Sequence, residues 1–198
     1  MPKRVNKEAK RIQIRQAAVE VFATRGMRAT KMADIATQAG IGKGTVYEYY
    51  GSKEEIFTDA MLWYMTSIED AVTKQISQVS DPRAKLRSLV WGMIDGASTL
   101  GEYIGIMLDF WGEGLRADGL GQWRDVYQSY IDVVDAILRE GVEKKVFRNI
   151  DTRSLASALI GLFDGLIFQM ILFGPDYPVR KTVDVLIDSF LHGVELNK

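Results

Sequence analysis

The sequence predicts an all-α protein of about nine helices, with a small N-terminal head over residues 1–53 and a larger helical domain over residues 54–198. Apolar residues recur at helical spacing along most of the chain, and no segment keeps a period-two alternation. Glycine and proline breaks separate the helical stretches from one another. These observations favour a helical bundle and exclude a sheet-based fold.

The first expected helix covers residues 8–25 and ends at Gly26, and two short helices around a glycine turn should follow. Thr30 is expected to cap the first of these short helices with its hydroxyl. Gly40 supplies the positive φ that a sharp turn needs. The second short helix runs from about residue 42 to residue 50. This helix-turn-helix pattern predicts a DNA-binding head, because its second helix can enter a major groove.

At these residues the chain resembles a known family. The segment TKMADIATQAGIGKGTVYEYYGSKEEIF, residues 30–57, is similar to the DNA-binding signature of the TetR family of tetracycline-repressor-like bacterial regulators. RIQIRQAAVEVFATRG resembles the family's first helix, so the likeness covers about residues 8–57. Glu48 and Lys31 depart from the family pattern and leave the identity of the operator open. The resemblance implies a ligand-responsive repressor with about nine helices, three of them in the head.

By this resemblance the second short helix is the recognition helix. Lys43 and Thr45 lie near its N-terminus, where side chains reach base edges. Gly44 would allow close backbone approach, and tyrosine hydroxyls or lysines would bind phosphate oxygens. The alternative is that the tyrosines are half-buried packing residues and the lysines form a solvated face. The predicted DNA contacts are Thr30, Lys31, Lys43, Gly44, Thr45, Tyr47, Tyr49 and Lys53.

Charge is distributed in a way that fits one DNA-binding end. The formal net charge is −1, yet residues 1–53 hold 11 Lys+Arg against 4 Asp+Glu, a balance of +7. The remainder holds 14 against 22, a balance of −8. A basic head on an acidic body suits a protein that contacts phosphate at one end. The alternative is a basic-headed helical module that binds an anionic membrane or an acidic protein partner.

The inventory of reactive groups argues against an enzyme. The chain has no cysteine, and its one histidine, His192, is expected at the surface. No phosphate loop, nucleophile elbow or H-E-x-x-H segment is present in the sequence, so no catalytic residue, metal or cofactor is predicted. MPKRVNKEAKR is a basic lead without an apolar signal segment, which favours the cytoplasm.

The larger domain is punctuated by clear helix signals. Ser52 should cap a long helix to about residue 78, and Asp81-Pro82 starts a helix over 82–99. Asp151 or Thr152 should cap the next-to-last helix, which the GPDYP break ends. The remaining expected helices cover residues 102–114, 122–145 and 179–196.

The helix over residues 155–173 is apolar almost all round, with Gly161 and Gly165 four residues apart. A homodimer interface is expected there, because a helix apolar on most faces must be buried on two sides. A membrane span is the alternative, and a central Asp164 disfavours it by about 2.5–3.5 kcal/mol. The predicted dimer-interface residues are Leu155, Gly161, Leu162, Gly165, Leu166, Leu186 and Phe190.

The middle of the chain is rich in aromatic residues, methionines and isolated carboxylates. Ordinary core packing explains any one of them, but as a group they fit a pocket for a small hydrophobic or amphipathic effector, which the family resemblance also implies. An acyl-type ligand would suit the apolar residues and a lipophilic cation the carboxylates. The predicted ligand-binding residues are Trp63, Trp91, Asp95, Tyr103, Met107, Phe110, Trp111, Tyr127, Asp164 and Phe168.

Overall fold

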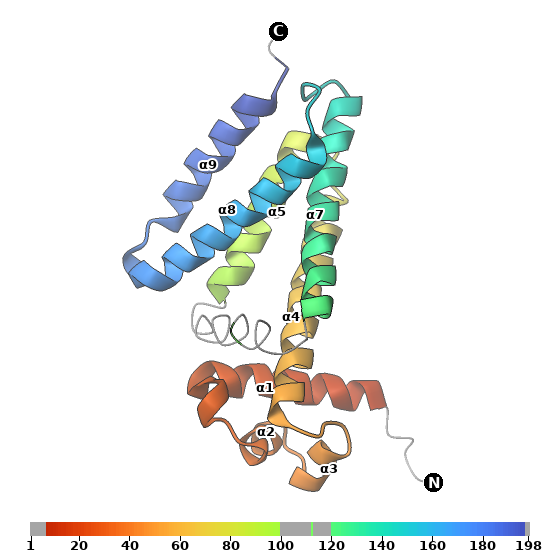
Figure 1. Ribbon diagram of the computed structural model, residues 1–198, viewed down its shortest axis with the longest axis vertical. Coiled ribbons are helices and arrows are strands. Elements are labelled where there is room, and N and C mark those ends of the chain that lie inside the picture. Colours follow the sequence, from red (N-terminus) through yellow and green to blue (C-terminus); the bar gives the residue numbers. More distant parts are fainter. Residues whose placement is uncertain (1–6, 100–111, 113–119, 197–198) are drawn as a thin grey trace. The chain divides into compact units, whose positions relative to one another are not determined.

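The computed structural model describes residues 7–99, 112 and 120–196. The chain divides into two compact units, one over residues 1–66 with 100–123 and one over residues 67–99 with 124–198. Figure 1 labels the helices of both. The described residues are helical with short connections, as the sequence predicts. The expected helix over 102–114 lies outside the described residues.

The first unit holds α1 (Lys7–Ala29), α2 (Met32–Gln38), α3 (Lys43–Tyr47) and the start of α4 (Lys53–Ile76) (Figure 1). α1 is kinked at Gly26, whose φ of 73° and ψ of 160° are not helical. The rings of Phe22 and Phe57 meet edge-on with centroids 5.0 Å apart, which packs α1 against α4. The fully buried side chains around this pair include Ile14, Ile35, Val46, Ile56 and Met61.

The helix-turn-helix pair forms with the predicted turn. Gly40 has a φ of 64°, and Ile35, Ala36 and Ala39 are buried as the helical spacing indicates. The second helix is shorter than predicted, because α3 gives way to turns after Tyr47.

The second unit holds the rest of α4 with α5 (Pro82–Thr99), α7 (Leu120–Glu143) from residue 124 onward, α8 (Thr152–Phe173) and α9 (Val179–Val194). Gly174–Asp176 forms a short 3-10 turn between α8 and α9. Asp151 caps α8 as predicted, since its side chain accepts a hydrogen bond from the Ser154 N–H at 3.1 Å. The apolar residues of these helices share one core, which includes Leu86, Ile94, Leu138, Leu159, Phe163, Val183 and Ile187.

Polar contacts also join the helices of the second unit outside this core. Ion pairs join α5 to α9 or its C-cap at three levels: Arg83 with Glu195, Arg87 with Asp188, and Arg180 with Asp95. A backbone hydrogen bond joins the connector after α7 to the end of α9: the Arg148 N–H donates to the Val194 carbonyl at 2.9 Å.

Gly141 is required by the packing of this connector. Phe147 is 1% exposed and lies against the backbone of α7, so that a Cβ at position 141 would come within 1.9 Å of its ring. No flexible side-chain tip can move aside there, because the ring itself belongs to the core.

We therefore expect Gly141→Ala to lower the free energy of unfolding by about 1–3 kcal/mol, the usual range for overpacking a core. Urea denaturation followed by circular dichroism would measure it. Gly193→Ala in α9 is the control: a Cβ there meets nothing within 4 Å, and the higher helix propensity of alanine should stabilise the chain by up to about 1 kcal/mol. Equal effects of the two substitutions would contradict the packing argument.

Candidate nucleic-acid interface and effector site

The residues of α3 divide into an inner and an outer face. Val46 is fully buried and Tyr50, just beyond the helix, is 2% exposed, so both hold α3 against the head. Lys43, Gly44 and Tyr47 are exposed. The Lys43 ammonium lies 5.6 Å from the centroid of the Tyr47 ring, a cation–π contact on the outer face. Thr45 and Tyr49 are half-buried. The structure thus leaves the predicted base-reading residues accessible on one short helix.

Thr30 does not cap α2 as predicted. Its side chain is buried, and its hydroxyl donates to the Gly26 carbonyl at 2.8 Å instead of capping α2. The N-cap of α2 is Lys31, whose backbone N–H donates to the Asp34 carboxylate at 2.9 Å. The prediction that the Thr30 hydroxyl caps α2 is therefore wrong, and the Thr30 side chain is 1% exposed. Lys31 remains exposed.

Lys53 also differs from its predicted use. Its ammonium donates to the carbonyls of Met27, Arg28 and Thr30 at 2.9, 3.0 and 3.0 Å. An ammonium has only three hydrogens to donate, so these bonds occupy them all. The side chain binds the head's own backbone rather than pointing at a phosphate.

Asp59 of α4 joins three segments of the head. Its carboxylate accepts two hydrogen bonds from the Arg15 guanidinium, at 2.8 and 3.0 Å, and one from the Tyr50 hydroxyl at 2.5 Å. Burial opposes ionisation of Asp59, but the hydrogen bonds from Arg15 and Tyr50 outweigh it and lower its pKa. Burial, then the bond to Asp59, raises the pKa of Tyr50. The carboxylate is therefore charged and the phenol neutral at physiological pH.

Sequence reasoning missed two basic residues of α1 that adjoin the motif. The Arg11 guanidinium lies 5.5 Å from the centroid of the Tyr50 ring, and its side chain is exposed. Lys10 bonds Gln13, which in turn donates to the Ala39 carbonyl at the start of the motif turn at 2.7 Å. The signal was the spacing of Lys7, Lys10 and Arg11, which share one helical face. Lys10 and Arg11 are additional candidates for phosphate contacts.

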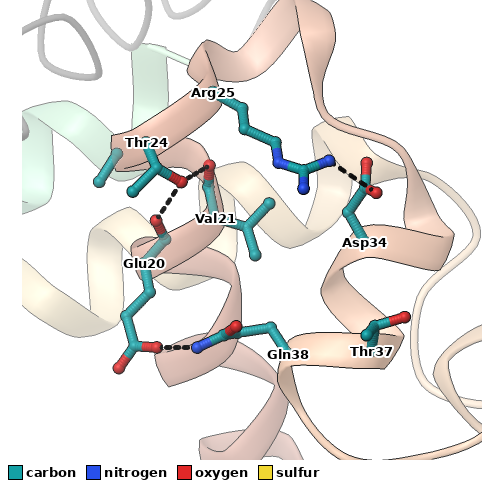
Figure 2. Close-up of a pocket in the computed structure, with 8 residues that line it drawn as sticks. Glu20, Val21, Thr24, Arg25, Asp34, Thr37 and Gln38 are labelled. Atoms are coloured by element: carbon teal, nitrogen blue, oxygen red, sulfur yellow. Dashed lines mark hydrogen bonds and ion pairs between the residues drawn. The ribbon is translucent and has the colours of Figure 1, made fainter.

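A polar pocket of about 380 Å³ lies between α1 and α2 (Figure 2). The Glu20 carboxylate accepts from Gln38, and Arg25 pairs with Asp34 at 2.9 Å, so each pair spans the two helices (Figure 2). These groups satisfy one another. The pocket is explained as the seam that holds α2 on α1.

In the second unit the structure brings together two of the predicted effector residues. The Tyr127 hydroxyl of α7 donates to the Asp164 carboxylate of α8 at 3.1 Å. Burial raises the pKa of Asp164, although this hydrogen bond partly offsets it. Glu69 and Tyr130, which were not predicted, adjoin this pair. Burial raises the pKa of Tyr130, and electrostatic interactions with Glu69, Tyr127 and Asp164 raise it further. Glu69 accepts a hydrogen bond from Ser129.

Other predicted effector residues lie in different surroundings. Asp95 is exposed and paired with Arg180 at 3.0 Å, and the same guanidinium lies 5.1 Å from the centroid of the half-buried Trp91 ring. Phe168 is 48% exposed. Trp63 is half-buried on the part of α4 that belongs to the first unit. Four predicted residues lie outside the described part of the chain: Tyr103, Met107, Phe110 and Trp111.

The predicted dimer residues divide by helical phase. Gly161, Leu162 and Gly165 are exposed on α8. Leu166 is 6% exposed and belongs to the core of its own unit, so its side chain is not available to a partner. Three others are partly buried against that core: Leu155, Leu186 and Phe190.

Comparison with known proteins agrees with this geometry. The family model of bacterial regulatory proteins of the tetR family matches residues 14–60. The model of the BetI-type transcriptional repressor C-terminal region matches residues 82–192, more than half of the chain. The chain belongs to the tetR family. It is accordingly a ligand-responsive, DNA-binding transcriptional regulator of the repressor class and not an enzyme.

Relatives in the tetR family match over nearly the whole length. The HTH-type transcriptional regulator BetI of Paraburkholderia phytofirmans is 28% identical over 194 residues, covering 95% of each chain. The fatty acid metabolism regulator protein of Bacillus subtilis is 23% identical over 192 residues, covering 95% of this chain and 97% of that protein.

Solved structures establish the fold of this tetR-family chain. A transcriptional regulator from Saccharomonospora viridis, solved in complex with choline, has a TM-score of 0.84 and 24% identity, covering 97% of this chain and 100% of that one. FadR from Bacillus subtilis, solved with stearoyl-CoA, has a TM-score of 0.74 and 22% identity, covering 93% of this chain and 99% of that one.

The Asp59 network predicts an acid-sensitive head. Because the pKa of Asp59 is lowered in the fold, its stabilisation is complete above the unfolded value of about 4 and is lost as the pH falls below it. Asp59→Asn should cost about 2 kcal/mol of unfolding free energy at pH 7, and the gap to wild type should narrow at lower pH. Thermal melts across pH 3–7 would show this, with exposed Asp70→Asn on the same helix as control. A gap that stays constant with pH would refute the assignment.

Proposed function

We propose that the chain binds a palindromic DNA operator as a homodimer in the bacterial cytoplasm, and that a small effector bound by the second unit releases it. The main support for DNA binding is the exposure of α3. Val46 and Tyr50 are buried and hold this segment on the head, while Lys43, Gly44 and Tyr47 are exposed. One helix of this length reads only a few base pairs, so two copies related by a two-fold axis are needed for an operator.

We assign the predicted functional division, a DNA-binding part over 1–53 and an effector and dimerisation part over 54–198, with α4 as the shared element. α4 begins in the head, where its residues Lys53 and Asp59 bond the other segments of the head, and it continues into the second unit as far as Ile76. It is the segment through which a change in the second unit would reach the head.

The dimer proposal is supported by an exposed stripe along α8. Residues of this stripe recur at helical spacing, and Leu162, Phe168 and Leu172 are 48, 48 and 63% exposed. A Cβ at Gly161 or Gly165 would meet nothing within 4 Å, so the chain's own packing does not require either glycine. Glycines exposed on an apolar helix face are explained by the close approach of another helix. A second copy of α8 supplies it.

The alternative occupant of this stripe is a lipid bilayer. Thr152–Asp176 is long and apolar enough to cross a membrane by length and composition, and 28% of its apolar 18-residue stretch is buried. Asp164 at its centre bonds Tyr127 of α7, and Phe163 and Ile160 lie in the core with α5, α7 and α9. We favour the dimer because one side of this helix is already part of a folded core.

For the effector we favour a lipophilic cation over an acyl chain. Asp164 and Glu69 are two carboxylates near two tyrosines, and among the residues that the structure describes neither carboxylate is in an ion pair. A partly buried carboxylate with a raised pKa gains when a cation is bound beside it, and aromatic rings favour quaternary ammonium groups. The choline complex of the Saccharomonospora viridis regulator provides a suitable probe.

Selection from randomised duplex DNA at two salt concentrations tests whether the chain binds a palindromic operator. We expect an enriched palindrome whose half-sites lie about 34–36 Å apart, or a multiple of that spacing. Leu162→Asp should weaken the dimer by about a hundredfold or more, because it buries a charge without a partner, and operator affinity should fall with it. Sedimentation velocity would report the oligomeric state.

Leu196→Asp is the matched control for this experiment, since Leu196 has the same 48% exposure outside α8. Salt-sensitive binding without any enriched sequence would favour the alternative function, a basic-headed module for an anionic membrane or an acidic protein. A monomeric wild-type chain that still selects a palindrome would remove the role given to α8.

Titration calorimetry with choline and with stearoyl-CoA tests the effector class. Choline should bind wild type, and Asp164→Asn should weaken it about tenfold or more, as expected for loss of a charged partner. Since protonation of Asp164 competes with the cation, affinity should fall as the pH drops through its raised pKa. Asp95→Asn, at an exposed carboxylate paired with Arg180, is the control. Binding of stearoyl-CoA alone would overturn the cation assignment.

A further inference from the structure

A lysine at the first position of α4 is electrostatically misplaced. The N-terminus of a helix carries the positive end of its dipole, where acidic side chains are favoured and a cation is not. Glu54 and Glu55 follow that rule, whereas Lys53 breaks it. A residue that violates a local rule generally serves a purpose elsewhere in the structure. The destination of the Lys53 side chain identifies that purpose.

The ammonium of Lys53 is directed at the last residues of α1, beyond the kink at Gly26, and at Thr30, which follows α1. Because Gly26 leaves helical geometry, the carbonyls that follow it have lost their regular helical arrangement. Lys53 collects the carbonyls of Met27, Arg28 and Thr30, while the Thr30 hydroxyl takes the carbonyl of Gly26. Two side chains thus fix a connection that would otherwise depend on solvent.

This connection determines where the helix-turn-helix lies. It ends at Lys31, the N-cap of α2, and α2 leads through the Gly40 turn into α3. On the other side of α3, Asp59 binds Tyr50 and Arg15. The first two turns of α4 therefore hold the motif at its entry through Lys53 and at its exit through Asp59.

We propose that Lys53 is a positioning residue for the recognition helix and not a phosphate contact. It acts through the 27–30 backbone, setting the angle at which α2 and α3 leave α1. The proposal rests on operator binding as the proposed function, but it separates two quantities that a phosphate contact would change together: the preference for the operator and the salt dependence of binding.

The test measures affinity for the selected operator and for a scrambled duplex of the same length, each at several salt concentrations. A lysine that binds a phosphate contributes about 0.9 to the slope of log K against log salt and equally to both duplexes. For Lys53→Met we expect an unchanged slope on either duplex, with affinity for the operator about tenfold lower and affinity for the scrambled duplex unchanged. Lys31→Met, at an exposed lysine that is a predicted DNA contact, is the control and should reduce the slope.

Lys53→Arg gives an independent reading if the methionine variant does not fold. Arginine keeps the charge and binds phosphate well, but its planar fork does not match three carbonyls gathered around one nitrogen. We expect this variant to lose operator preference with its slope intact. Restored operator affinity in Lys53→Arg, or a slope lowered by about 0.9 in Lys53→Met, would overturn the proposal. The slope on scrambled DNA does not depend on an operator, so it tests Lys53 even if wild type selects no sequence.

Discussion

The geometry of the DNA-binding head depends on the charged carboxylate of Asp59. Through this carboxylate α4 holds both α1, by way of Arg15, and the end of the recognition segment, by way of Tyr50. Its lowered pKa shows that these bonds outweigh the burial of the charge. Since α3 has only five residues, it has almost no stability of its own. Its orientation therefore comes from these tertiary contacts.

α8 must satisfy two opposite requirements along one helix. One side supplies Leu159, Phe163 and Leu166 to the core, and the other presents a glycine-containing apolar stripe. Burial of the Asp164 carboxylate on this helix is unfavourable to the fold, and the hydrogen bond from Tyr127 offsets only part of that desolvation. A carboxylate at such a position is better explained by ligand binding than by a contribution to stability, because an apolar residue would suit the core better.

Local patterns predicted the fold well, and long-range contacts account for the errors. The spacing of Ile35 and Ala39 and the glycine at position 40 are local signals, and the structure confirms each. The partners of Thr30 and Lys53 depend on a kink at Gly26 and on a contact across more than twenty residues, which no periodicity encodes. Leu162 and Leu166 are both apolar and four residues apart, so composition could not reveal that only one of them faces the core.

The same internal contacts change how the charge of the head should be understood. Residues 1–53 have a balance of +7, but not all of that charge faces outward. Arg15 is bound to Asp59, which lies outside residues 1–53, and Lys53 is bound to backbone carbonyls. Charges that are neutralised or held inside the head before DNA arrives displace few counterions on binding. We therefore expect the phosphate contacts to come from a smaller set, the exposed cations of α1 and α3 with Lys31 at the N-cap of α2. The electrostatic part of the affinity should then be weaker than the sequence count implies.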